Sequence, residues 1–233
     1  MNLSEPPDAP YYDARRLVAE VFTEAFAPPR RQSVAEWAAE HRWLANEGGG
    51  YVGKWRHDIA PYLHAPMEAL TDNRYLTIAI AGPGQSGKTE IVLNWLGASI
   101  QGDPADMLWY LQTDAVTQAF VKTRIEPLIE DHPSLRAQRG LRAVDDSLGF
   151  KRFRGMTTEF LSATRSGMIN KRAPRIVADE WDAYADDLGD PKALLDIRRQ
   201  TYGRESKLVA ISHPDKAAGS RPSASRRLAS SRA

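Results

Sequence analysis

The chain has 233 residues, of which 42% are hydrophobic, and its formal net charge is +1. This length and composition allow one large α/β domain with extensions, and they argue against two full domains. The sequence has no cysteine, which excludes disulfides and thiolate metal sites and is consistent with a reducing compartment. Because it shows neither a signal peptide nor an apolar run long enough for a membrane span, we expect a soluble, cytoplasmic protein with no membrane partner.

Two helices are expected before the first strand. Residues 13–26 place apolar side chains at helical spacing, and Ser33 opens a Ser-x-x-Glu capping box whose helix is expected to stop at the glycines 48–50. We assign residues 1–50 to an N-terminal helical extension that packs on the following domain. Residues 51–73 are rich in proline and aromatic side chains, which predicts irregular structure.

A phosphate-binding loop follows an expected strand at residues 75–81. Its pattern is G-x-x-x-x-G-K-[ST], and its residues are Gly82, Pro83, Gly84, Gln85, Ser86, Gly87, Lys88 and Thr89. An amphipathic helix is expected to begin near Lys88, so strand, loop and helix come in the order that this motif requires. The loop N–H groups and the helix N-terminus would hold phosphate oxygens, Lys88 would reach the β- and γ-phosphates, and Thr89 would bind Mg²⁺.

Four further strand-like runs follow that helix. They are residues 107–112, 159–162, 175–179 and 207–212, and another helix is expected from Asp114 to the segment before Pro133. Strands that alternate with helices indicate a mainly parallel sheet with helices on both faces. We therefore assign residues 51–215 to an α/β domain of the P-loop NTPase type. Residues 216–233, rich in Ser, Arg and Ala, are expected to form a disordered basic tail.

Two carboxylates, Asp179 and Glu180, end the run at residues 175–179. A short apolar run predicts a buried parallel strand, here a neighbour of the strand before the phosphate loop, with its carboxyl end at the sheet edge where ligands bind. We expect Asp179 to hold Mg²⁺ and Glu180 to orient and deprotonate the attacking water. We thus assign catalysis to Glu180 and Lys88, and we assign metal binding to Thr89 and Asp179. The expected cofactors are ATP and Mg²⁺.

Other polar residues are not assigned to the catalytic site. The Asn-Lys pair at 170–171 is followed by Ala173 where a guanine-reading motif would have Asp, so guanine specificity is not supported. The acidic residues Asp186, Asp187 and Asp190 are interpreted as solvated surface and not as a two-metal centre. The histidines show no ligand spacing and are interpreted as non-catalytic; they are His41, His57, His64, His132 and His213.

Four segments occur in an informative order. They are residues 55–67, residues 85–90 with Asn94, residues 179–184, and Gly203-Arg204 leading to residues 211–214. This order resembles the ATPase domain of lambda-type phage terminase large subunits, over roughly residues 30–215. The resemblance implies a motor that drives double-stranded DNA into a capsid with a small terminase subunit, a portal protein and further copies of itself.

The resemblance also has implications for single residues. It implies that the segment before the first strand helps to bind adenine, with Tyr62 or Trp55 as stacking surfaces, and that Ser212 lies in a motif coupling hydrolysis to movement. A ring motor usually completes each site with an arginine from a neighbouring subunit. The candidates here are Arg165, Arg172 and Arg204.

The chain also departs from that family. Members continue into an endonuclease domain, whereas this chain ends soon after Pro214, so it is expected to be truncated before the nuclease and to lack nuclease activity. Two alternatives stay open. One is a helicase-like P-loop ATPase that acts on nucleic acid, and the other is an inactive prophage remnant that binds only nucleotide or a partner.

Overall fold

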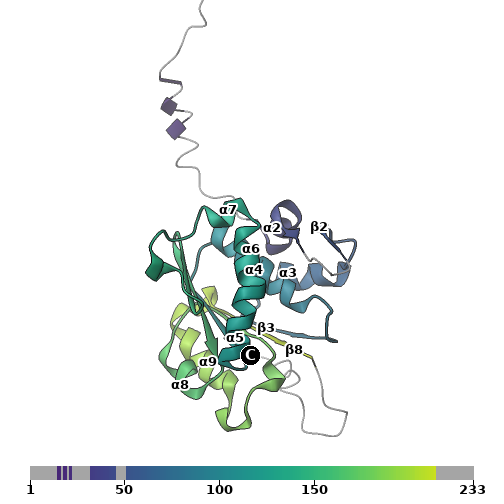
Figure 1. Cartoon of the computed structure of the whole chain (residues 1–233), viewed down its shortest axis with the longest axis vertical. Coiled ribbons are helices and arrows are strands. Elements are labelled where there is room, and N and C mark those ends of the chain that lie inside the picture. Colours follow the sequence, from purple (N-terminus) through teal and green to yellow (C-terminus); the bar gives the residue numbers. More distant parts are fainter. Residues whose placement is uncertain (1–14, 17, 20, 23–31, 46–50, 214–233) are drawn as a thin grey trace, which may run out of the picture. The chain divides into compact units, whose positions relative to one another are not determined.

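The computed structural model describes residues 15, 16, 18, 19, 21, 22, 32–45 and 51–213 (Figure 1). The chain divides into two compact units, Met1–Arg30 and Arg31–Ala233. In the first unit the described residues are helical, within the helix predicted at 13–26. The rest of that helix, the glycines 48–50 and the predicted tail at 216–233 lie outside the described residues.

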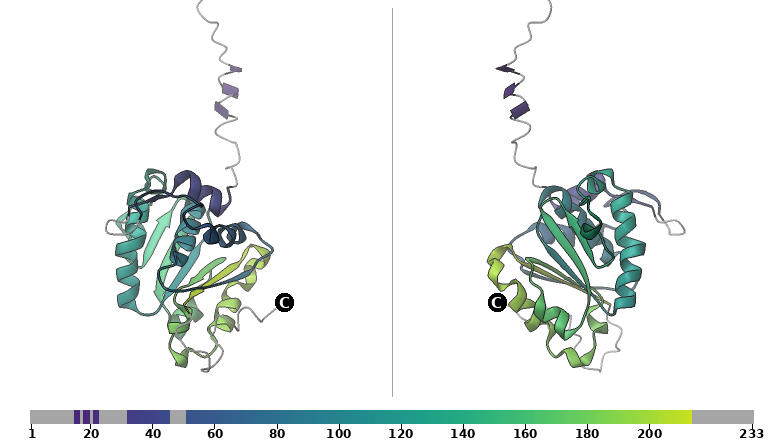
Figure 2. Two further views of the ribbon diagram at one scale, coloured as in Figure 1. Left: turned by 90° about the vertical axis from the view of Figure 1, so that its right-hand side faces the viewer. Right: turned by 60° about the vertical axis from the view of Figure 1, so that its left-hand side comes forward.

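A six-stranded sheet runs through the described part of the second unit (Figure 2). Its strands are β3 (Thr77–Ala81), β4 (Met107–Leu111), β5 (Phe150–Phe153), β6 (Met156–Ser162), β7 (Arg175–Ala178) and β8 (Lys207–Ser212). The order across the sheet is β3-β8-β7-β4-β6-β5, and every neighbouring pair is parallel except β5 with β6. The predicted α/β class with a mainly parallel sheet is confirmed, and β5 is an additional strand that the sequence did not indicate.

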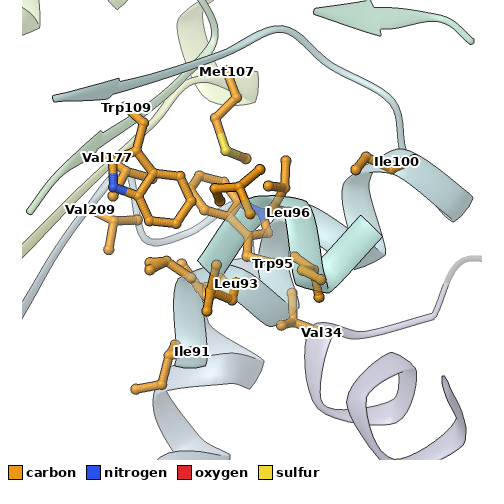
Figure 3. Packing of buried hydrophobic residues seen from close by; sticks show 14 of the residues in the cluster. Val34, Ile91, Leu93, Trp95, Leu96, Ile100, Met107, Trp109, Val177 and Val209 are labelled. Carbon is orange, nitrogen blue, oxygen red and sulfur yellow. The ribbon is translucent and has the colours of Figure 1, made fainter. Parts of the chain in front are cut away.

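The central strands β4, β7 and β8 are buried along their whole length. Alternate residues of a strand face opposite sides of the sheet. Trp109 and Val177 accordingly join one apolar cluster, whereas Tyr110 and Ala178 join another on the opposite face. Figure 3 shows Trp109 in the first cluster. Burial on both faces explains why these strands have continuous apolar sequences.

Helices cover both faces of the sheet (Figure 2). The first cluster is completed by α2 (Val34–His41), α3 (His64–Thr71), α4 (Lys88–Gly102), α5 (Asp114–Phe120), the π-helix η2 (Val121–Ile125), α6 (Glu126–Glu130) and α7 (Pro133–Arg136). The second is completed by α8 (Arg165–Asn170), α9 (Pro191–Arg199) and the 3-10 turns η4 (Trp181–Ala183) and η5 (Asp186–Leu188). None of the described helices is both long and apolar enough to cross a bilayer.

The capping box predicted at Ser33 is present at the start of α2. The Ser33 hydroxyl accepts from the Glu36 N–H at 3.1 Å, and a Glu36 carboxylate oxygen accepts from the Ser33 N–H at 2.9 Å. The helix ends at His41, earlier than predicted, because the chain turns into β1 (Trp43–Leu44), which pairs with β2 (Gly53–Lys54). The α2 helix packs on α4 within the second unit.

Residues 51–73 are more regular than predicted, since they contain β2, the 3-10 turn η1 (Pro61–Leu63) and the α3 helix. Pro61 begins η1, and Pro66 lies in the first turn of α3, where the missing N–H has no intrahelical partner. Proline therefore does not interrupt either element. The expectation of an irregular segment was wrong because it gave these prolines weight as helix breakers.

Two short turns complete the described elements. The 3-10 turn η3 (Ala143–Asp145) precedes β5, and η6 (Gln200–Glu205) joins α9 to β8. Within η6, Gly203 has a φ of +54°, a conformation that glycine adopts readily. This turn lets the chain reverse and enter the sheet as β8.

Candidate nucleotide site

The phosphate loop connects the carboxyl end of β3 to the N-terminus of α4. The sequence predicts Asp179 on a strand adjacent to β3, but β8 lies between β3 and β7, so the carboxylates stand one strand further away. Parallel β3, β8, β7 and β4 all end at the same edge of the sheet. The segments that follow these strands therefore converge, as ligand sites in open α/β sheets require.

A cleft of about 730 Å³ opens at this edge. Loop residues 84–89 line it, together with Asp179 and Glu180 from the end of β7 and His213 from the end of β8. The cleft thus brings together the two motifs that the sequence predicted as one site, although they are far apart in the chain.

The phosphate loop is held by hydrogen bonds to its own carbonyls. The Lys88 Nζ donates to the carbonyl of Gly82 at 3.0 Å and to that of Pro83 at 2.5 Å, and the Ser86 hydroxyl donates to Pro83 at 2.9 Å. The lysine side chain therefore lies folded over the loop. Its ammonium group is already beside the backbone that would surround a phosphate group.

Two residues of the loop have left-handed backbone conformations. Gly87 has a φ of +78°, and a Cβ at this position would lie 3.0 Å from the Leu63 Cδ1, so glycine is favoured on both counts. Gln85 has a φ of +57°, which is uncommon for a residue with a side chain. Backbone strain of this kind is typical of ligand-binding loops.

Asp179 follows the buried strand β7 and is only 5% exposed. Its N–H donates to the Tyr110 carbonyl at 2.9 Å, which continues the pairing of β7 with β4. Burial raises the pKa of Asp179 to about 6; the negative charge of Glu180 adds to the rise, while Lys88 opposes it. Among the described residues no cation forms an ion pair with this carboxylate. A buried carboxylate in this position is suited to a bound cation.

Glu180 adopts a left-handed conformation, with φ +52° and ψ +47°. Its N–H donates to Oδ1 of Asp179 at 3.0 Å, and its Oε2 lies 2.6 Å from Nδ1 of His213. The Glu180 side chain is 36% exposed, so solvent water reaches it. The spacing of His213 in the sequence did not indicate this contact, which exists only because β7 and β8 end side by side.

Ser212 connects three segments of the site. Its carbonyl accepts from the Gly82 N–H at 3.2 Å, and its hydroxyl donates to Oδ2 of Asp182 at 2.7 Å. The same hydroxyl accepts from the Asp182 N–H at 3.1 Å. The end of β8 is therefore bonded both to the phosphate loop and to the turn after Glu180. A role of Ser212 in coupling stays a prediction.

The two aromatic residues suggested for adenine binding occupy different environments. Tyr62 is exposed, and its hydroxyl donates to the Ser86 carbonyl at 3.1 Å. Trp55 is buried in the first apolar cluster, and its indole N–H donates to His57 at 3.2 Å. Trp55 therefore offers no free ring face to a base, whereas Tyr62 lies beside the loop and keeps that prediction.

The three arginines suggested for a trans role do not line the cleft of their own chain. Arg165 begins α8, and its Nη1 donates to the Leu188 carbonyl at 3.5 Å. Arg172 precedes β7 and Arg204 lies in η6, and both are exposed. An arginine that completes a neighbour's site need not line its own, so their role stays a prediction.

One arginine lines the cleft in the described part of the chain, and it is Arg124 of η2. No sequence pattern indicated this residue, because a single arginine within a helix forms no motif. The described residues also contain no group of three or more His, Asp or Glu side chains placed to hold a metal ion. Nucleotide sites commonly hold Mg²⁺ through one or two protein groups and the substrate phosphates, an arrangement that needs no such group.

The parallel sheet and the phosphate loop, with the acidic pair at the end of the second strand from β3, define a P-loop nucleoside-triphosphatase fold. The chain belongs to the family described as "Phage terminase large subunit gpA, ATPase domain", which matches residues 49–232. The resemblance predicted from the sequence motifs is thereby confirmed. Membership in an ATPase family implies nucleotide binding.

Two curated relatives carry the name terminase, large subunit. That of Escherichia phage lambda is 28% identical over 178 residues, covering 73% of this chain and 28% of the relative. That of Enterobacteria phage P21 is 24% identical over 174 residues, covering 71% of this chain and 27% of the relative. The chain thus spans little more than a quarter of the length of these relatives.

A solved structure supports the fold independently. The crystal structure of the HK97 bacteriophage large terminase matches with a TM-score of 0.60 and 13% sequence identity, covering 79% of this chain and 38% of that chain. At this level of identity the match concerns the fold alone. It confirms the arrangement of a mostly parallel sheet flanked by helices.

Proposed function

We propose that this chain hydrolyses ATP and that the hydrolysis drives double-stranded DNA into a phage capsid. The observation that carries the proposal is the cleft in which the phosphate loop meets Asp179 and Glu180. Membership in a terminase ATPase family supports ATP hydrolysis, and the names of the two curated relatives support DNA packaging. The proposed partners are DNA, a small terminase subunit, a portal protein and further copies of the chain.

The loop and the α4 helix would bind the phosphate groups. Backbone N–H groups of residues 84–88 and the partial positive charge at the N-terminus of α4 attract phosphate oxygens. Lys88 would exchange its bonds to the Gly82 and Pro83 carbonyls for bonds to the β- and γ-phosphates. This exchange costs little, because the ammonium group keeps oxygen partners throughout.

Asp179 and Thr89 would hold a Mg²⁺ ion together with the nucleotide. Both line the cleft, and a carboxylate and a hydroxyl are oxygen ligands of the type that Mg²⁺ prefers. The buried Asp179, whose pKa is raised by loss of solvent, forms no ion pair among the described residues and would gain a directly bound cation. When bound, the ion would neutralise charge on the phosphates and help to orient them.

Glu180 would act as the general base. Water would attack the γ-phosphorus, the bond between this phosphorus and the β–γ bridging oxygen would break, and the Glu180 carboxylate would accept the water proton. Because Glu180 is partly exposed and held by Asp179 and His213, it can reach a water molecule while keeping one orientation. The products would be ADP and phosphate.

The test is the rate of ATP hydrolysis by the purified chain, with and without double-stranded DNA. We expect DNA to stimulate the rate, Lys88→Ala to abolish it, and Glu180→Gln to bind ATP but turn it over very slowly. Arg136→Gln, a change on α7 outside the cleft, serves as the control and should leave the rate unchanged. Normal turnover by the Glu180 variant would contradict the assigned base. Hydrolysis that ignores DNA would contradict the motor function while leaving the ATPase assignment in place.

A further inference from the structure

One face of the helical segment formed by α5 and η2 lines the nucleotide cleft. Val116, Phe120 and Arg124 follow each other at intervals of four residues, and all three contribute to the lining. Side chains four apart lie on the same side of a helix. Arg124 therefore faces the same cleft as Lys88 and Glu180.

Arg124 belongs to the π-helical turn η2 between α5 and α6. A π-turn inserts an extra residue into a helix, which changes the direction of the side chains after it, and such turns are frequent at functional sites. In this segment Val121 and Ile125 point into the apolar core, whereas Arg124 points into the cleft. The turn thus combines burial on one side with a cation on the other.

Glu90 fixes the position of Arg124. This carboxylate directly follows Thr89 of the phosphate loop, and its Oε1 accepts from the Arg124 Nη2 at 2.5 Å. Its other oxygen, Oε2, accepts from the Arg42 Nη2 at 2.8 Å. The two guanidinium groups therefore share one carboxylate.

The two arginines differ in exposure and hence in what they can bind. The Arg42 side chain is 8% exposed and the Glu90 side chain 17%, whereas Arg124 is 40% exposed. The buried pair of Arg42 and Glu90 is already neutral, so Arg124 adds an uncompensated positive charge on the solvent side. That charge faces the cleft proposed to bind a nucleoside triphosphate, which carries several negative charges.

We propose that Arg124 binds the phosphate groups of the nucleotide within its own subunit, and that Glu90 positions it for this contact. The proposal rests on the proposed ATPase function. A guanidinium group forms paired hydrogen bonds with phosphate oxygens, and a nucleoside triphosphate carries more negative charge than one shared carboxylate. Arg124 would be a phosphate-binding arginine in cis, distinct from any arginine that a neighbouring subunit supplies.

The test measures how tightly the purified chain binds a non-hydrolysable ATP analogue and ADP, each in the presence of Mg²⁺. It also measures kcat and KM for ATP. We expect Arg124→Gln to weaken binding of the ATP analogue by about 10- to 100-fold, the range for losing a charge-assisted hydrogen bond. Arg124→Lys should give intermediate affinity, because it keeps the charge but loses the paired geometry. Arg136→Gln is the matched control, since Arg136 is an exposed arginine paired with Glu130 outside the cleft.

Thermal unfolding of each variant separates binding from stability. If Arg124 only stabilises the fold through Glu90, Arg124→Gln would lower the melting temperature and leave analogue affinity and kcat/KM unchanged, and this result would overturn the proposal. Equal affinity in the Gln and wild-type proteins would overturn it as well. Failure of the proposed ATPase function is recognised separately, because the wild-type chain would then bind the analogue without hydrolysing ATP. The affinities would still test Arg124.

Discussion

The Nδ1 atom of His213 lies 2.6 Å from Oε2 of Glu180 and joins the ends of β8 and β7. The preceding residue, Ser212, ends β8, and its hydroxyl donates to Asp182, two residues after Glu180. Ser212 and His213 therefore both hold the segment that carries the proposed base. Glu180 itself has a left-handed backbone, a conformation that non-glycine residues adopt at a cost of about 1–3 kcal/mol. The contacts with β8 therefore stabilise a placement that the local backbone disfavours.

We predict that His213→Ala lowers kcat for ATP hydrolysis by about 10-fold with little change in KM. This loss is smaller than the roughly 100- to 10,000-fold that a general base itself contributes. The reason is that the Glu180 carboxylate loses the partner that orients it, while the phosphate loop is untouched. His213→Asn, which can still donate a hydrogen bond, should recover part of the rate. His41→Ala on α2 is the control. Steady-state kinetics gives the answer, and an unchanged kcat would show that the contact has no part in hydrolysis.

The second prediction concerns the stability of the chain at neutral pH. The pKa of Asp179 is about 6 in the folded chain and 3.8 for an unperturbed Asp, so the folded state binds this proton more tightly than the unfolded state does. The stabilisation is complete below about pH 4 and is lost as the pH rises through 6. At pH 7 the free energy of unfolding of the Asp179→Asn variant should therefore exceed that of the parent chain by up to about 3 kcal/mol, at about 1.36 kcal/mol per pKa unit.

Chemical denaturation at pH 4 and pH 7 measures this difference. The gain from Asp179→Asn should be nearly complete at pH 7 and mostly lost at pH 4, and the variant should bind Mg²⁺ with nucleotide more weakly. Asp187→Asn, a change at an exposed acid of η5, is the control and should be neutral at both pH values. An Asn variant that is less stable than the parent at pH 7 would contradict the prediction.

The elements that the sequence predicted correctly are those whose signal is local. The phosphate loop is defined by its own residues, and the apolar run before Asp179 does form the buried strand β7. Strand β5 gave no such signal, because Lys151 lies at an inward position where an apolar residue is expected. Its ammonium group is buried against Glu126 and Asp146, and those partners are recognised only in the folded chain.

Contacts between distant segments escaped prediction for a related reason. Arg124 and Glu90 are 34 residues apart, and the α5–η2 segment has to pack beside α4 before they meet. The contact between His213 and Glu180 depends in turn on the strand order, which places β8 beside β7. Periodicity and motif spacing describe single segments. The order of strands in the sheet is a property of the whole chain.

The third prediction concerns the packing of α2 on α4. A Cβ at Gly97 would lie 2.1 Å from Cη2 of Trp37, so any larger residue clashes with the indole ring. Gly97→Ala should destabilise the chain by about 1–3 kcal/mol, the usual cost of overpacking, although alanine is the better helix former by about 1 kcal/mol. Thermal or urea unfolding measures this loss.

A second substitution distinguishes the clash from other causes. Trp37→Leu removes the ring atoms that a Cβ at Gly97 would meet, so the double variant should lose less stability than the sum of the two single variants. Ala98→Gly, the adjacent position on α4, is a control for general effects on helix stability. Additive losses in the double variant would show that Gly97 is required for another reason.

The fourth prediction concerns Lys207 at the start of β8. Its Nζ donates to three carbonyls, those of Ala69, Asp72 and Tyr75, at 3.0, 2.8 and 2.9 Å. Burial nevertheless lowers its pKa to about 8 from 10.5, so the unfolded chain holds this proton more tightly than the folded chain does.

Raising the pH from 8 to 10 should therefore stabilise the folded chain, because Lys207 loses its proton more easily there than in the unfolded chain. This stabilisation is lost as the pH falls back through 8. Lys207→Met removes the titrating group, so the difference in unfolding free energy between parent and variant should grow with pH over this interval by an amount on the order of 1 kcal/mol. Because other groups titrate equally in both proteins, the difference isolates Lys207. Lys122→Met, at an exposed lysine of η2, should show no such trend. A difference that stays constant from pH 7 to 10 would mean that Lys207 keeps its proton in the folded chain as firmly as in the unfolded one.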